Sequence, residues 1–195
     1  MKRLLLSLCC SLAACHAGSE EPLDAASAEP RTDSQVEVDS GQAPADLATI
    51  RSLLQARHAE DLPSAEQLAH YPSAEASLRY LAEHGETMVL RVRALALLEH
   101  YGSDATGELL TRFAADLELH PALRAAALTG MAGQALDDQP ERLAVVVAAL
   151  HDGDPRVGVA AVELLDRSAA GRDALSQASQ AADLPKAVRE AIEAR

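Results

Sequence analysis

An internal repeat constrains the fold of this chain more than any other feature of its sequence. Three segments of equal length align with one another, namely Leu90–Leu98, Leu123–Met131 and Val157–Leu165. Their fifth positions are the regularly spaced Ala94, Ala127 and Ala161, and a truncated fourth copy begins at Val188. A regular period of this kind is typical of α-solenoids, in which each repeat is a helical hairpin that stacks on the next.

Each copy follows a segment that carries the apolar spacing of another amphipathic helix. We expect these preceding helices at about 73–84, 104–117, 139–151 and 171–182. Ser64–Gln67 predicts a capping box, and five glycines fall where helices should stop: Gly85, Gly102, Gly133, Gly153 and Gly171. From Asp46 to Arg195 the sequence therefore predicts one all-α domain.

The second helix of each hairpin resembles its counterpart in HEAT-repeat proteins. In that family the helix opens with a Pro-x-Val-Arg-like start and carries a small residue four positions after the Val. Pro121–Arg124 and Pro155–Val157 match this opening, and the small residues are Ala127 and Ala161. The resemblance covers about residues 73–195 and implies a short α-solenoid of about three to four hairpins. Residues 46–71 lack the period, so we expect them to form an N-terminal helical cap.

HEAT-repeat proteins carry an arginine at one position of the second helix, and three of the four copies in this chain have it. Arg91, Arg124 and Arg189 occupy it, whereas Gly158 replaces the family's arginine in the third copy. We expect these arginines to pair with acids in the turns between helices (Asp116, Asp152 or Asp154). A row of anion-binding groups is the alternative interpretation.

The segment Met1–Ala14 has the pattern of a secretory signal peptide. Lys2 and Arg3 precede the apolar run Leu4–Ala14, which is too short to span a bilayer as a helix. Leu12–Cys15 resembles the bacterial lipobox, which implies cleavage before Cys15 and a diacylglycerol on its sulfur. An ordinary signal peptide with a chance cysteine is the alternative, although the chain has no cysteine beyond Cys15.

The segment from Cys15 to Ala45 is predicted to be a disordered acidic tether. Residues 16–45 hold seven acidic residues against Arg31 and have no apolar face. The whole chain carries a net charge of -13, which argues against nucleic acid as a partner. The lipobox resemblance implies a lipid anchor in the bacterial cell envelope, and His16 after the lipidated cysteine favours the outer membrane in a Gram-negative host.

No catalytic or metal-binding motif stands out, and we expect no cofactor and no metal. The seven histidines include no pair at i, i+4 spacing. Three of them, His84, His100 and His151, come just before helix-ending glycines, where imidazoles interact favourably with helix carbonyls.

We number the repeat positions from Leu90, Leu123 and Val157. Helical geometry then predicts that positions 3, 7 and 10 of the second helices face away from the core. The candidate binding residues at these positions are Val92, Ala96, Glu99, Ala125, Thr129, Val159, Glu163 and Asp166. Such a row suits a partner helix or an extended peptide, and packing against neighbours alone is the alternative.

The leading hypothesis is therefore a membrane-anchored lipoprotein whose repeat domain is a non-enzymatic module that binds another envelope protein. An enzyme acting on a small molecule and a purely structural spacer are the alternatives.

Overall fold

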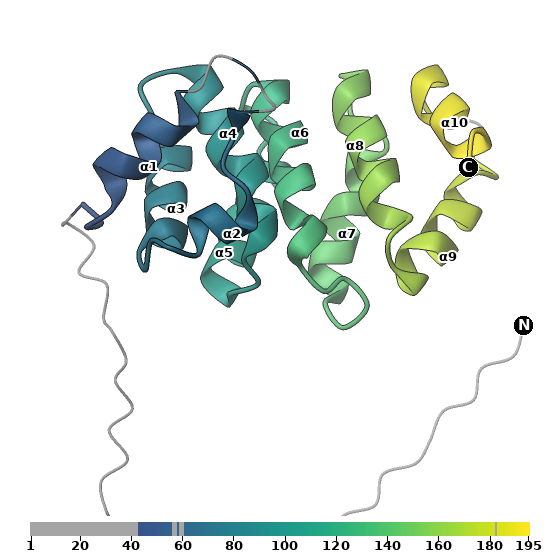
Figure 1. The fold of residues 1–195 in the computed structure, drawn as a ribbon. Coiled ribbons are helices and arrows are strands. Elements are labelled where there is room, and N and C mark those ends of the chain that lie inside the picture. Colours follow the sequence, from purple (N-terminus) through teal and green to yellow (C-terminus); the bar gives the residue numbers. More distant parts are fainter. Residues whose placement is uncertain (1–42, 56–57, 59–60, 182) are drawn as a thin grey trace, which may run out of the picture. The chain divides into compact units, whose positions relative to one another are not determined.

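The computed structural model describes residues 43–55, 58, 61–181 and 183–195 (Figure 1). The predicted signal peptide, Cys15 and almost all of the predicted tether lie outside these residues. Every regular element in the described ranges is helical: ten α-helices, together with the short 3-10 helices η2 (Leu98–His100) and η3 (Met131–Gly133). The predicted all-α class is confirmed. Within these ranges, no helix combines the length and the apolar character that a membrane span requires.

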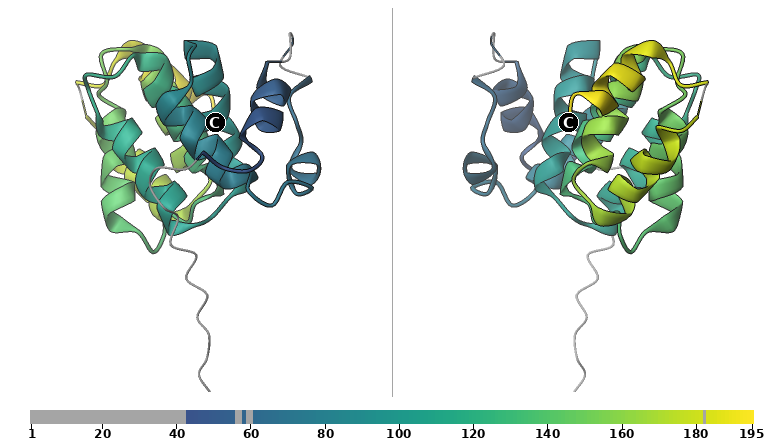
Figure 2. Two further views of the ribbon diagram at one scale, coloured as in Figure 1. Left: turned by 90° about the vertical axis from the view of Figure 1, so that its left-hand side faces the viewer. Right: turned by 90° about the vertical axis from the view of Figure 1, so that its right-hand side faces the viewer.

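Eight of the helices follow the order predicted for the hairpins. Three pairs pack against each other as hairpins: α3 (Ala74–His84) with α4 (Met88–Leu97), α5 (Asp104–Ala115) with α6 (Pro121–Gly130), and α7 (Pro140–Ala149) with α8 (Pro155–Leu165). The last two helices, α9 (Ala169–Ala178) and α10 (Lys186–Glu193), each pack on α8. The first helices pack in the order α3, α5, α7, α9, and the second helices in the order α4, α6, α8, α10. The result is a solenoid of two helical layers (Figures 1 and 2).

Two further helices precede the hairpins. Helix α1 (Leu47–Leu54) packs on α3 and α4, and α2 (Ala65–Leu68) begins at the predicted capping box, in which Ser64 and Gln67 bond each other's backbone N–H groups. Asp46 and Ser73 join the start of α1 to the start of α3. The Asp46 carboxylate accepts hydrogen bonds from the Ser73 backbone N–H (2.9 Å) and hydroxyl (2.7 Å), and the Asp46 N–H donates to Ser73 Oγ (3.0 Å).

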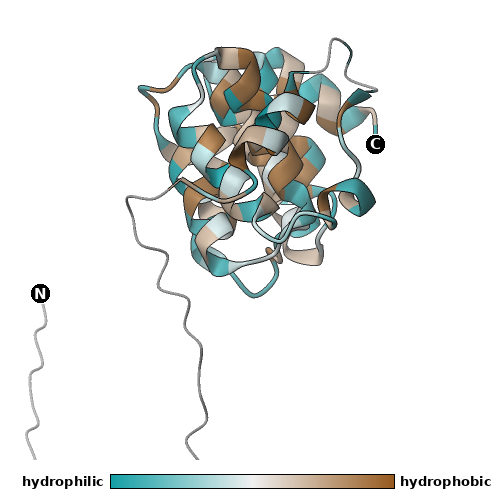
Figure 3. Cartoon of the chain, turned by 60° about the vertical axis from the view of Figure 1, so that its left-hand side comes forward, coloured by the Kyte–Doolittle hydropathy of each residue, from teal (hydrophilic) through white to brown (hydrophobic). Residues whose placement is uncertain are grey.

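The core lies between the two layers and along the contacts between successive second helices. Ala94, Ala127 and Ala161, the small residues of the repeat, are fully buried. Gly130 allows α6 to approach α4 closely, because an added Cβ would lie 2.3 Å from the carbonyl oxygen of Leu95. Figure 3 shows many hydrophobic residues on the helices and hydrophilic ones on most of the connecting turns.

The expected bounds of the fourth first-layer helix, 171–182, are wrong. Helix α9 runs from Ala169 to Ala178, because Ser168 is its N-cap and accepts the N–H of Gly171 (2.9 Å). Gly171 therefore lies in the first turn of a helix instead of at a helix end. A Cβ there would lie 2.1 Å from the carbonyl oxygen of Leu165, so the residue allows α9 to approach the end of α8.

The predicted arginine pairing is confirmed at one of its three positions. Arg124 forms an ion pair with Asp152 (2.8 Å). Arg91 and Arg189 instead donate to backbone carbonyls, those of Ala82 (2.9 Å) and Leu184 (3.1 Å).

Candidate functional site

Four of the eight residues predicted to bind a partner line one groove between α6 and α8. Ala125 and Thr129 come from α6, and Val159 and Glu163 come from α8, where Pro155, Arg156 and Ala160 complete the lining. The groove has a volume of about 440 Å³. The helical period explains this arrangement, because the second helices pack side by side and present the same repeat positions along one face.

The groove has a floor of small residues and a polar rim. Ala125 and Ala160 are half-buried and pack against the core, while Thr129, Arg156 and Glu163 are exposed. The Thr129 hydroxyl donates to the Ala125 carbonyl in its own helix (3.2 Å). Because the floor carries no large side chain, the backbone of an incoming segment could approach both helices closely.

The rim of the groove carries one compensated and one uncompensated charge. Arg156 donates twice to Asp154, from Nε (3.0 Å) and from Nη2 (2.7 Å). Hydrogen bonds from the Arg156 side chain and backbone N–H lower the pKa of Asp154 to about 2. Glu163 forms no ion pair with any described residue. The groove therefore presents a net negative charge to a partner.

The other four predicted residues do not join this groove. Val92, on α4, is half-buried and packs against the core. Ala96 on α4 and Glu99 on η2 are half-buried as well. Asp166 caps the end of α8, pairs with Arg195 (2.6 Å) and lines a separate hollow of about 160 Å³. The structure thus brings together the α6 and α8 members of the row and separates the rest.

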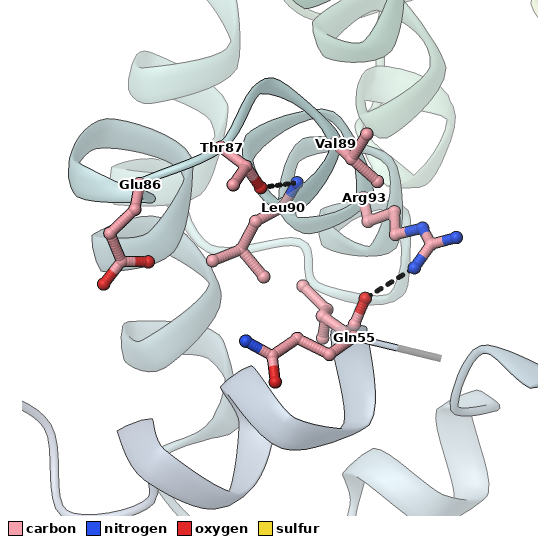
Figure 4. Close-up of a pocket in the computed structure, with 7 residues that line it drawn as sticks. Gln55, Glu86, Thr87, Val89, Leu90 and Arg93 are labelled. Atoms are coloured by element: carbon pink, nitrogen blue, oxygen red, sulfur yellow. Dashed lines mark hydrogen bonds between the residues drawn. The ribbon is translucent and has the colours of Figure 1, made fainter. Parts of the chain in front are cut away.

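A second hollow, of about 290 Å³, lies between the end of α1 and the start of α4 (Figure 4). Its lining is Leu54, Gln55, Glu86, Thr87, Val89, Leu90 and Arg93. Arg93 Nη1 donates to the Leu54 carbonyl (2.7 Å), which ties α4 to the last turn of α1, and the Thr87 hydroxyl accepts the Leu90 N–H (3.2 Å). Glu86 pairs with Arg51 (3.0 Å).

Sequence reasoning missed this second hollow. Val89 is 57% exposed, and it stands one helical turn before Arg93. In the repeat register Val89 corresponds to Arg156 and Arg93 to Ala160, two residues of the α6–α8 groove. The repeat positions three residues before Val92 and Ala96, which are Val89 and Arg93, are therefore the signal that could have located it.

Three of the histidines are predicted to lie at helix ends. His84 is the last residue of α3, His100 ends η2, and His151 follows α7, so all three lie at helix ends as expected. The ring of His84 lies against that of Tyr80, with centroids 4.6 Å apart. In the ranges that the structure covers, no group of His, Cys, Asp or Glu side chains is arranged to hold a metal ion.

Comparison with protein-family models, with curated proteins and with solved structures finds no match to this chain.

Proposed function

We propose that this protein is a lipid-anchored, non-enzymatic binding module of the bacterial envelope, and that it captures a helix of another envelope protein in the α6–α8 groove. The groove itself is the observation that supports the proposal most, because repeat positions selected from the sequence for facing away from the core line it together. A HEAT-like origin is supported by the prolines that open α6 and α8 and by the buried alanine at each helix crossing.

The sequence before the domain supports the anchor. Cys15 follows an apolar run and the small residues Ala13 and Ala14, which is the chemical requirement of a lipobox. The acidic residues 16–45 would then tether the domain to the membrane at a distance on the order of 30 Å. His16 favours the outer membrane.

The chemistry of the groove selects its occupant. Half-buried alanines on the floor suit the small apolar side chains of an amphipathic helix laid along α6 and α8. The uncompensated Glu163 and the chain's net charge of -13 favour lysine or arginine along the flank of that helix. The proposed partner is therefore an envelope protein with a basic amphipathic helix.

Photo-crosslinking in cells tests the proposal. A benzophenone amino acid at the exposed Thr129 should form an adduct with one defined protein, whereas the same group at Glu108, exposed on α5, should not. The adduct protein must contain a basic amphipathic helix, and a synthetic copy of that helix must bind the purified chain.

A matched pair of charge reversals then locates the binding site. Glu163→Lys should weaken binding of the synthetic helix at least about tenfold, and Glu108→Lys should leave it unchanged. Adducts at position 108 alone, or equal affinity for both variants, would contradict the groove as the binding site.

A further inference from the structure

A third hollow lies beside the turns of the first two hairpins, on a different part of the domain from the α6–α8 groove. It has a volume of about 330 Å³, and its polar lining comes from Glu83, His84, Arg91, Arg112 and Asp116. Phe113 and Leu119 supply its apolar wall. The proposed function does not use any of these residues.

This hollow lies at the junction of the first and second hairpins, where the arginine of one hairpin is near the turn of the next. The repeat allows this first junction to be compared with the second one, between the second and third hairpins. Arg91 and Arg124 occupy the same repeat position in successive copies. Asp116 and Asp152 also correspond, because each lies in the turn between the two helices of a hairpin and accepts the backbone N–H two positions further on. The acceptor distances are 3.0 Å from Glu118 N and 2.8 Å from Asp154 N.

The two junctions differ in whether the arginine meets the acid. At the second junction Arg124 closes on Asp152 with hydrogen bonds of 2.8, 2.8 and 3.1 Å, and the side chains are only 7% and 4% exposed. At the first junction Arg91 donates its Nε to the Ala82 carbonyl and lies over the Phe113 ring, 5.9 Å from the centroid. The hollow opens where the next repeat has its ion pair.

The hollow therefore holds one cation and one anion that have no ionic partner among the described residues, Arg91 and Asp116. The remaining charges compensate each other, because Arg112 pairs with Glu83. Arg112 also lies over Phe113, 5.4 Å from the ring centroid, so both guanidinium groups are within cation–π distance of the same ring.

We propose that this hollow binds a small zwitterion of the amino-acid class. The ligand's carboxylate bonds the Arg91 guanidinium, its ammonium bonds the Asp116 carboxylate, and an apolar side chain rests on Leu119 and Phe113. The ligand supplies at this junction the two charges that Arg124 and Asp152 supply to each other at the next one. A volume of about 330 Å³ is at the small end of ligand sites and fits a single amino acid.

Calorimetric titration of the full-length chain in detergent solution tests the proposal, with leucine, N-acetyl-leucine and leucinamide as probes. Leucine should bind, and each blocked form should bind about tenfold more weakly or worse, because each lacks one of the two charges. Asp116→Asn keeps an oxygen that accepts the Glu118 N–H but removes the charge. It should weaken leucine about tenfold and leave N-acetyl-leucine unaffected.

Glu118→Gln is the matched control, because Glu118 is exposed and is absent from the lining, and the substitution makes the same charge change two positions away. Affinity for leucine should be unchanged in this variant. Three results would overturn the proposal: no saturable binding of leucine, equal affinity for the free and blocked forms, or equal effects of Asp116→Asn and Glu118→Gln. A loss of thermal stability in Asp116→Asn as large as that in Asp152→Asn would also overturn it, because Arg91 would then pair with Asp116 in solution.

Discussion

Arg124 and Asp152 form a buried ion pair that joins the second and third hairpins of the solenoid. Arg124 begins the second turn of α6, and Asp152 lies in the turn before α8. The guanidinium also donates to the carbonyls of Leu117 and Leu119 in its own hairpin, and the carboxylate accepts the Asp154 N–H. The pair therefore fixes the turns of two successive hairpins relative to each other.

Removing one partner of this pair should destabilise the domain strongly. Asp152→Ala leaves a guanidinium that is 7% exposed without its counter-charge, and the expected loss in the free energy of unfolding is about 3 kcal/mol. Glu83→Ala removes the partner of Arg112, which is 62% exposed, so its expected loss is below about 1 kcal/mol. Urea unfolding of both variants measures the difference, and equal losses would mean that the buried pair is not formed.

Acid should weaken the start of α8. The pKa of Asp154 in the folded protein is about 2, below its ordinary value of 3.8, so the folded state binds this proton less readily than the unfolded state does. The stabilising contribution is complete above pH 3.8 and is lost as the pH falls from there towards 2. Carbon-detected NMR titration of the carboxyl should give the low value, and Arg156→Gln should raise it towards that of an ordinary aspartate.

A buried hydroxyl in α3 is expected to cost stability. Ser77 is fully buried, and its Oγ has no hydrogen-bond partner among the described residues. Ser77→Ala should therefore raise the free energy of unfolding by up to about 1 kcal/mol, or leave it unchanged. Thr106 is equally buried but donates to Glu75 Oε1 (2.6 Å), so Thr106→Val should cost about 1.5–3 kcal/mol. Chemical denaturation would contradict this account if both substitutions changed stability in the same direction.

The sequence predicted the hairpins because two independent signals agree on them. Apolar spacing locates each helix, and prolines at 121, 140 and 155 mark the first turns of α6, α7 and α8. Gly171 predicts a helix end, but Ser168, one turn earlier, is a good N-cap, and α9 begins after it. Local chemistry therefore located most helix ends, and a competing local signal misplaced one.

The side-chain partners were less predictable than the helices. The same repeat position contacts an acid at Arg124 and a backbone carbonyl at Arg91, since the path of each turn decides which acceptor lies within reach. The helical register predicts that Val92 and Ala125 face away from the core, but both are half-buried and pack against it. Helix α1, which lies outside the repeat period, packs on α4, and such a contact cannot be inferred from the repeat alone.

The proposed anchor makes a prediction about Cys15, which lies outside the described residues. Cys15→Ser removes the thiol that would accept the diacylglycerol, so cells given a clickable palmitate analogue should label the parent chain and not the variant. The precursor of the variant should also remain uncleaved at this position. Cys9→Ser is the control and should label normally. Label retained on the Cys15→Ser protein would contradict the lipoprotein proposal.

Gly158 and Val188 make a testable pair at the C-terminal end of the solenoid. A Cβ on Gly158 would lie 2.4 Å from Val188 Cγ2 of α10, which explains why the third copy of the repeat has no side chain where the others have arginine. Gly158→Ala should therefore displace α10 and cost about 1–3 kcal/mol, although alanine is the better helix former.

A second substitution separates this clash from any effect on α8 itself. Val188→Ala removes the methyl group that the new Cβ would meet, so Gly158→Ala should cost less in that background than in the parent chain. A coupling energy of about 1 kcal/mol in the double-mutant cycle, measured by urea unfolding, would support the contact. If the two effects simply add, α10 does not pack on Gly158, and the missing arginine has another cause.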